Sequence, residues 1–86
     1  MRIPTRVTVD NSASENSTLL EITAEDRPGL LYGIASGISA EGCNIEVVLI
    51  DTEAHRAIDV FYITKAGRKL NDTESRKIAS SLTSHL

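Results

Sequence analysis

The sequence predicts an α+β domain in which two helices cover one face of a four-stranded antiparallel sheet. Three observations indicate this fold class. Apolar residues form four strand-like segments and recur at helical spacing in two others. These segments follow one another in the order β-β-α-β-β-α. The 86 residues suffice for one domain with a modest core.

The first two predicted strands are joined by a polar loop. Alternating valines indicate a short strand over residues 6–10, and the Asn- and Ser-rich residues 11–17 are typical of a loop. The second strand is predicted over residues 18–24. One of its faces carries Leu20, Ile22 and Ala24.

The first helix is predicted to begin near Pro28, with Asp26 as its N-cap, and to end at Gly42. Two further glycines, Gly33 and Gly37, fall on nearly one face of this helix. A bare helix face allows close approach, most simply by the sheet or by a neighbouring helix. The predicted apolar stripe consists of Leu30, Leu31, Ile34 and Ile38.

The second half of the chain repeats the pattern with two strands and a helix. Residues 44–52 and 56–64 carry apolar residues on both faces, and residues 53–55 form the turn between them. The last helix is expected to begin near Asn71, which forms a capping-box pattern with Glu74. Its apolar stripe consists of Ile78, Leu82 and Leu86.

Asp59 interrupts the apolar run of the last strand. Three interpretations stay open from the sequence: it caps a turn, it pairs with Arg56, or it lies at a contact between domains.

Without its first strand, the predicted order is a split βαβ unit that lacks its last strand. In the complete ferredoxin-like sheet, the last strand lies antiparallel beside the first. A strand over Arg6–Asp10 can fold back beside residues 18–24 and occupy this edge position. Because both helices then cover one face, the opposite face stays open. Apolar residues there favour burial against a second copy or a neighbouring domain over ordinary exposed aliphatic side chains.

Composition excludes several classes of protein. The net charge of −3, the pI of about 5.2 and the scarcity of aromatic residues argue against nucleic-acid binding. No apolar run is long enough for a signal peptide or a membrane span. Cys43 is the only cysteine, which fits a reducing compartment. We therefore expect a soluble cytoplasmic protein that contacts neither nucleic acid nor membrane.

Residues for catalysis are not apparent. The sequence has no phosphate-binding glycine motif, and His55 and His85 do not form a metal-ligand spacing with Cys43. The expectation is a chain without catalytic residues, metal site or cofactor.

The most informative segment spans residues 25–32, where a strand leads into a helix. Free N–H groups at a helix start carry the positive end of its dipole and suit a carboxylate or phosphate. Gly29 would let such a ligand approach, because it has no Cβ. The alternative is an ordinary helix start, and the pattern favours neither.

Three segments resemble the ACT domain. Residues 20–31, which contain the run D-R-P-G-L-L, are similar to its opening, and residues 42–45 resemble its helix-to-strand junction. Residues 56–64, which end in D-V-F-Y-I-T, and the following residues 67–70 are similar to the C-terminal ACT domains of PII-protein uridylyltransferases and related ACT-repeat proteins. The likeness extends from about Val7 to Leu82.

This resemblance implies a single ferredoxin-like ACT domain over residues 1–86, with residues 1–5 a loose terminus. It implies a homodimer or pairing with another ACT domain, and an amino acid bound at the contact. The implied binding residues are Asp26, Arg27, Pro28, Gly29, Leu30 and Leu31 in the loop and helix start, and Asn44 and Ile45 at the next strand.

In the uridylyltransferases such domains are thought to sense glutamine and to report nitrogen status to separate catalytic domains. The resemblance therefore implies an amino-acid-sensing regulatory domain, with glutamine as the implied ligand, in a chain that lacks those catalytic domains. The alternative is a ligand-free interaction module that only pairs domains.

One departure concerns ligand choice. Serine-binding ACT domains carry the pattern H-x-N-R-P-G, whereas this chain has Ala24 and Asp26 at the two polar positions. A carboxylate at Asp26 would repel a ligand carboxylate unless it meets the ligand's ammonium group or caps the helix. Serine specificity is not expected, and the identity of the ligand stays open.

Overall fold

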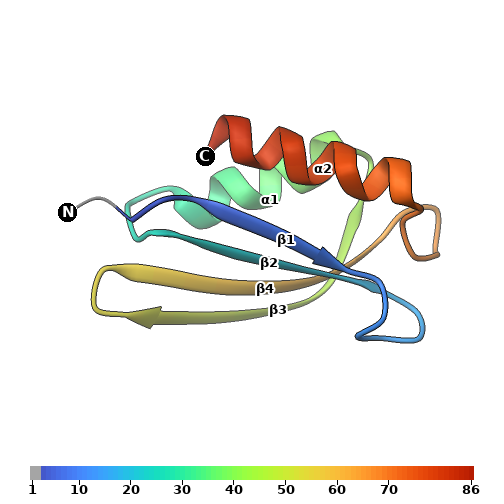
Figure 1. Cartoon of the computed structure of the whole chain (residues 1–86), viewed down its shortest axis with the longest axis horizontal. Coiled ribbons are helices and arrows are strands. Elements are labelled where there is room, and N and C mark those ends of the chain that lie inside the picture. The colour runs from blue at the N-terminus through green and yellow to red at the C-terminus, as the bar shows by residue number, and fades with distance from the viewer. Residues whose placement is uncertain (1–2) are drawn as a thin grey trace.

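A computed structural model describes residues 3–86 and shows the six elements in the predicted order (Figure 1). The strands are β1 (Arg6–Asp10), β2 (Thr18–Glu25), β3 (Asn44–Glu53) and β4 (Arg56–Thr64), and the helices are α1 (Leu30–Ala40) and α2 (Asp72–His85). Part of the expected loose terminus, residues 1–2, lies outside the described residues. Residues 3–5 precede β1 without helix or strand structure.

The four strands form one antiparallel sheet in the order β1-β2-β4-β3. β1 pairs with β2 at the edge, with Val9 opposite Leu20. The predicted edge position of the N-terminal strand is therefore confirmed. At the opposite edge, β3 pairs only with β4, and all ten of its residues are exposed.

Both helices pack on the same face of the sheet, as predicted (Figure 1). Leu20 and Phe61 face each other across β2 and β4 and are covered by the helices. The largest fully buried apolar side chains are Leu20, Ile22, Ile34, Ile38, Phe61, Ile63, Ile78 and Leu82. Their burial is the main favourable contribution to folding.

The start of α1 differs from the prediction. The helix begins at Leu30, and its N-cap is Gly29 rather than Asp26. Gly29 has a φ of +82°, which glycine adopts without strain, and the Leu30 N–H donates to the Arg27 carbonyl oxygen at 3.2 Å. Pro28 and Gly29 thus form a turn that delays the helix. No side chain within the described residues caps this end.

The apolar stripe of α1 is narrower than predicted. Leu30, Ile34 and Ile38 are buried, whereas Leu31 is 47% exposed. In the first turn, Leu31 lies about 100° around the helix from the buried Leu30, and its side chain remains half exposed there.

The start of α2 matches the capping-box prediction. The Glu74 N–H donates to the Asn71 side chain at 2.8 Å, and the Asn71 N–H donates to the Glu74 carboxylate at 2.9 Å. The Nη1 and Nη2 atoms of Arg68 also donate hydrogen bonds to this carboxylate, at 2.9 and 3.1 Å. The Arg68 hydrogen bond, followed by that from Asn71, lowers the pKa of Glu74 to about 2.

The bare face of α1 packs against α2. A Cβ at Gly37 would lie 2.6 Å from Leu82 Cδ2, whereas one at Gly33 would lie 3.6 Å from Leu86 Cδ2. The interpretation that these glycines admit a neighbouring helix is therefore confirmed. Gly37 marks the tighter contact, because Leu82 is buried in the core.

These contacts predict opposite effects for two matched substitutions. Gly33→Ala should raise the free energy of unfolding by up to ~1 kcal/mol through helix propensity. Gly37→Ala should lower the free energy of unfolding. Overpacking against Leu82 costs about 1–3 kcal/mol, which outweighs the gain from helix propensity. Urea denaturation of both variants checks this. Equal stability of the two would contradict the packing described.

A second prediction concerns acid sensitivity. Because the folded-state pKa of Glu74 is depressed from 4.5 to about 2, its stabilising contribution is present above pH 4.5 and is lost as pH falls toward 2. Glu74→Gln should therefore be less stable than wild type at pH 6, with a difference that shrinks by pH 2. Denaturation across this range measures the effect. Glu15→Gln, at an exposed loop position, is the control and should leave the free energy of unfolding unchanged at both pH 6 and pH 2.

Candidate ligand site at the start of helix α1

A pocket of about 320 Å³ lies between the start of α1 and the neighbouring ends of β3 and β4. Its size is at the lower end of the range of small-molecule sites. The lining residues are Asp26, Arg27, Gly29, Leu30, Leu31, Tyr32, Ile50, Thr52, Ala57 and Asp59. It remains open along β3, where Ile50 is 53% exposed.

The loop that forms the pocket's upper rim is tied to the β3–β4 hairpin. The Asp26 N–H donates to the His55 carbonyl oxygen at 2.7 Å, which holds the end of β2 beside the turn between β3 and β4. Gly29 leaves open space on its Cα, since a Cβ there would meet nothing within 4 Å. A small ligand can therefore approach the backbone at this point.

Two backbone N–H groups at the start of α1 are free. Leu30 and Gly33 donate to the carbonyl oxygens of Arg27 and Gly29, but within residues 3–86 no acceptor binds the N–H groups of Leu31 and Tyr32. The first turn also contains no acidic residue. These groups carry the positive end of the helix dipole and can donate hydrogen bonds to an anionic group.

Asp59 lies on the opposite wall. The register places it between Ile22 of β2 and Ile50 of β3, on the face that the helices cover. It is 3% exposed, and its Oδ1 atom has no hydrogen-bond partner among residues 3–86. Burial raises the pKa of its carboxyl group; the backbone N–H of Asp51 lowers it, and the carboxylates of Asp26 and Asp51 raise it.

This environment argues against two of the three open interpretations of Asp59. It lies in the middle of β4 and so caps no turn. Within residues 3–86 it forms no ion pair with Arg56, whose side chain is exposed. A contact with another domain stays a prediction.

The structure brings together part of the predicted binding set. Asp26, Arg27, Gly29, Leu30 and Leu31 line the pocket, and Pro28 lies in the same loop without lining it. Tyr32, Ile50, Thr52, Ala57 and Asp59 also line it and were not predicted. Asp59 could have been recognised from the sequence as an acidic residue within an otherwise apolar strand.

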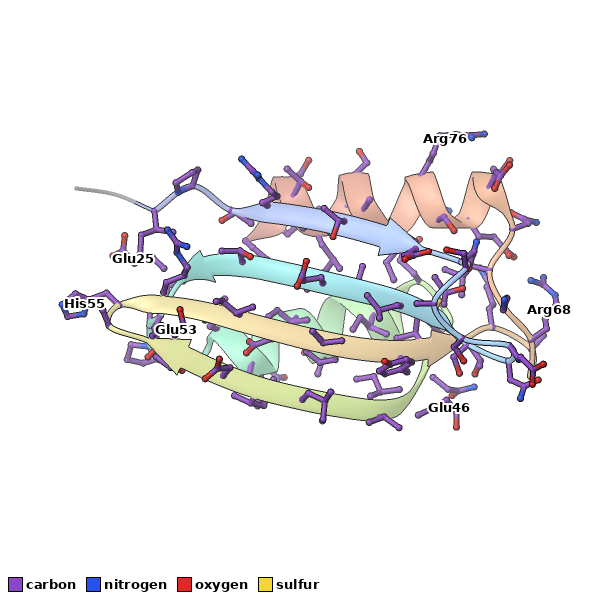
Figure 2. The ribbon with its side chains drawn as sticks, turned by 60° about the horizontal axis from the view of Figure 1, so that its bottom comes forward. Glu25, Glu46, Glu53, His55, Arg68 and Arg76 are labelled. Carbon is purple, nitrogen blue, oxygen red and sulfur yellow. The ribbon has the colours of Figure 1, made fainter. Side chains whose placement is uncertain are left out.

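Asn44 and Ile45 lie at the other end of β3. Figure 2 shows Glu46 at one end of the sheet and Glu53 and His55 at the other, the end that holds the pocket. At ~3.4 Å per residue, the strand separates Asn44 from Thr52 by roughly 27 Å. One copy of the chain therefore does not bring both halves of the predicted set to one ligand.

The described residues give little support for metal binding, a reactive thiol or a membrane-spanning helix. No group of three or more His, Cys, Asp and Glu residues in the described part of the chain could hold a metal ion. Cys43 is buried, and burial raises the pKa of its thiol, which is typical of a structural cysteine. No helix within residues 3–86 has the length and apolar character to cross a membrane.

Comparison with known proteins agrees with the fold. The family described as "ACR9-like, ACT-like domain" matches residues 6–86. The bifunctional uridylyltransferase/uridylyl-removing enzyme of Phenylobacterium zucineum is 46% identical over 76 residues, which cover 87% of this chain and 8% of that enzyme. No solved structure matches the chain.

Two further relatives carry the same name. That of Gluconobacter oxydans is 40% identical over 73 residues, covering 84% of this chain and 8% of the enzyme. That of Streptomyces coelicolor is 34% identical over 84 residues, covering 96% of this chain and 10% of the enzyme. The chain thus spans a tenth or less of the length of these relatives.

The 86 residues correspond to the ACT region of those enzymes and contain none of their catalytic domains. The match begins at the first residue of β1 and extends through all four strands and both helices. The chain therefore belongs to the ACT-like domain family.

Proposed function

We propose that this chain is a regulatory domain that senses an amino acid, with glutamine as the first candidate, in the pocket at the start of α1. The observation that carries the proposal is the pair of free N–H groups of Leu31 and Tyr32 beside the open space at Gly29. Together they form a site for the ligand's α-carboxylate.

The edge strand β3 supports pairing with a second copy or another ACT domain. Its central residues Val47, Val48, Leu49 and Ile50 are all exposed, and in the described part of the chain no strand lies beside its outer N–H and C=O groups. Edge strands are normally protected by charges, prolines or a cover. β3 carries the acidic residues Glu46, Asp51 and Glu53 toward its two ends, but its four central residues are all apolar. The most exposed apolar side chains of the sheet lie on β3, whereas Ile58, Val60 and Tyr62 on its open face are half-buried.

Antiparallel pairing of two β3 edges would also reunite the predicted binding set. In such a pair, the beginning of one strand lies beside the end of the other. Asn44 and Ile45 of one copy would then approach the pocket of its partner near Thr52. A ligand that contacts both copies stabilises the paired arrangement, and this bias is the regulatory signal.

The names of the relatives suggest what would receive the signal. In a protein with their organisation, the paired domains would act on uridylyltransferase and uridylyl-removing domains elsewhere in the chain. We propose that role for this domain in the same context.

The second candidate is a ligand-free pairing module. The exposed apolar strand β3 favours it equally well, because pairing alone would cover those side chains. Ligand binding separates the two candidates.

Isothermal titration calorimetry with L-glutamine, L-glutamate and L-serine tests the sensing function. We expect binding of L-glutamine. L-Serine should bind more weakly or not at all, because Ala24 and Asp26 stand at the His and Asn positions of the serine-binding pattern. A ligand at 100-fold its Kd should add about 2.7 kcal/mol to the free energy of unfolding. No heat and no thermal shift at millimolar ligand, with the dimer intact, would leave only the pairing module.

Sedimentation velocity tests the pairing surface. Leu49→Lys should shift a wild-type dimer to monomer, because it places a charge in the apolar edge. Thr8→Lys, at an exposed position on the opposite edge strand β1, is the matched control and should remain dimeric. A wild-type chain that is monomeric at high concentration would contradict pairing through β3.

A further inference from the structure

Within residues 3–86, Oδ1 of Asp59 is the one buried side-chain oxygen or nitrogen without a hydrogen-bond partner. Buried carboxylates are costly unless an opposite charge or hydrogen-bond donors meet them. An apolar residue at this position would continue the row formed by Ile22 and Ile50. Asp59 therefore weakens the fold, and its place in the pocket wall suggests a role in binding.

Among residues 3–86, no cationic side chain forms an ion pair with Asp59. The charged groups near it are the carboxylates of Asp26, in the loop before α1, and Asp51, on β3. Arg27 lines the same pocket, but its guanidinium donates to the carbonyl oxygens of Glu25 at 3.3 Å and Leu86 at 3.5 Å. The wall around Asp59 is thus negative.

The opposite side of the pocket is positive. The free N–H groups of Leu31 and Tyr32 lie at the helix start, and both residues line the pocket with Asp59. One small pocket therefore presents an anion-binding edge and an anionic wall. A zwitterion that carries both charges on adjacent carbons matches this arrangement.

We propose that the Asp59 carboxylate binds the α-ammonium group of the ligand whose α-carboxylate lies on the N–H groups of Leu31 and Tyr32. The inference rests on the proposed function and adds the residue that selects for a protonated amino group. A divalent metal ion is a poorer occupant, because no third suitable ligand joins the carboxylates among the described residues. A lysine side chain from another protein would meet Asp59 but would leave the helix N–H groups free.

The test compares L-glutamine with 4-carbamoylbutanoate, the same molecule without its α-amino group, by calorimetry at pH 7. Wild type should bind L-glutamine about tenfold or more tightly than the amine-free compound, as expected for a hydrogen-bonded charge pair. Asp59→Asn should lose about tenfold or more in affinity for L-glutamine and should no longer distinguish the two compounds. Glu53→Gln, at an exposed position of β3 outside the pocket lining, is the matched control and should retain the wild-type preference.

A stability measurement shows that the Asp59→Asn variant is folded. The pKa of Asp59 is raised in the folded state, so its unfavourable contribution is absent below its ordinary value of 3.8 and grows as pH rises through the folded-state pKa. Asp59→Asn should therefore melt at a higher temperature than ligand-free wild type at pH 7. This gain should disappear near pH 3.

The outcomes separate the two proposals. If Asp59→Asn binds L-glutamine as wild type does, or if wild type binds the amine-free compound equally well, the role of Asp59 is overturned while amino-acid sensing stands. If wild type binds no amino acid, both proposals fail. A variant that melts higher and loses preference for the amine supports the inference.

Discussion

The position at which α1 begins controls the chemistry at this end of the sheet. The Asp26 N–H bond to His55 ties the loop to the β3–β4 hairpin, and the left-handed Gly29 postpones the helix until Leu30. Within residues 3–86 no side chain caps the helix, and the residues that carry its free N–H groups, Leu31 and Tyr32, line the pocket. A helix that began at Pro28 under an Asp26 cap would have neutralised the same groups internally.

The two helix starts in this small domain illustrate opposite solutions to one problem. α2 is capped by Asn71 and Glu74, and Arg68 reinforces the cap, so its N–H groups are satisfied within the chain. α1 lacks a comparable cap and lies beside a buried carboxylate that also lacks a partner. Polar groups that the chain itself leaves unsatisfied at this point require an explanation, and the proposed ligand would provide one.

The exposed edge and the pocket are two parts of one surface. β3 contributes Ile50 and Thr52 to the pocket and leaves its whole length exposed. A neighbour that covers this edge would therefore also close the open side of the pocket. If the proposed ligand and the proposed pairing both hold, this shared surface would couple them, as a regulatory domain requires.

The sequence by itself determined the six elements, their order and the α2 capping box, because local periodicity and turn residues encode these features. The edge position of β1 followed from the element order, because an incomplete split βαβ unit leaves that position in the sheet vacant. Only the tertiary structure decided where α1 starts, since that depends on the φ of Gly29 and on hydrogen bonds between distant segments. It likewise decided the surroundings of Asp59, because the register of β4 between β2 and β3 sets which residues share its wall. Asn44 lies far from the pocket for the same reason: the antiparallel hairpin carries the start of β3 to the opposite end of the sheet.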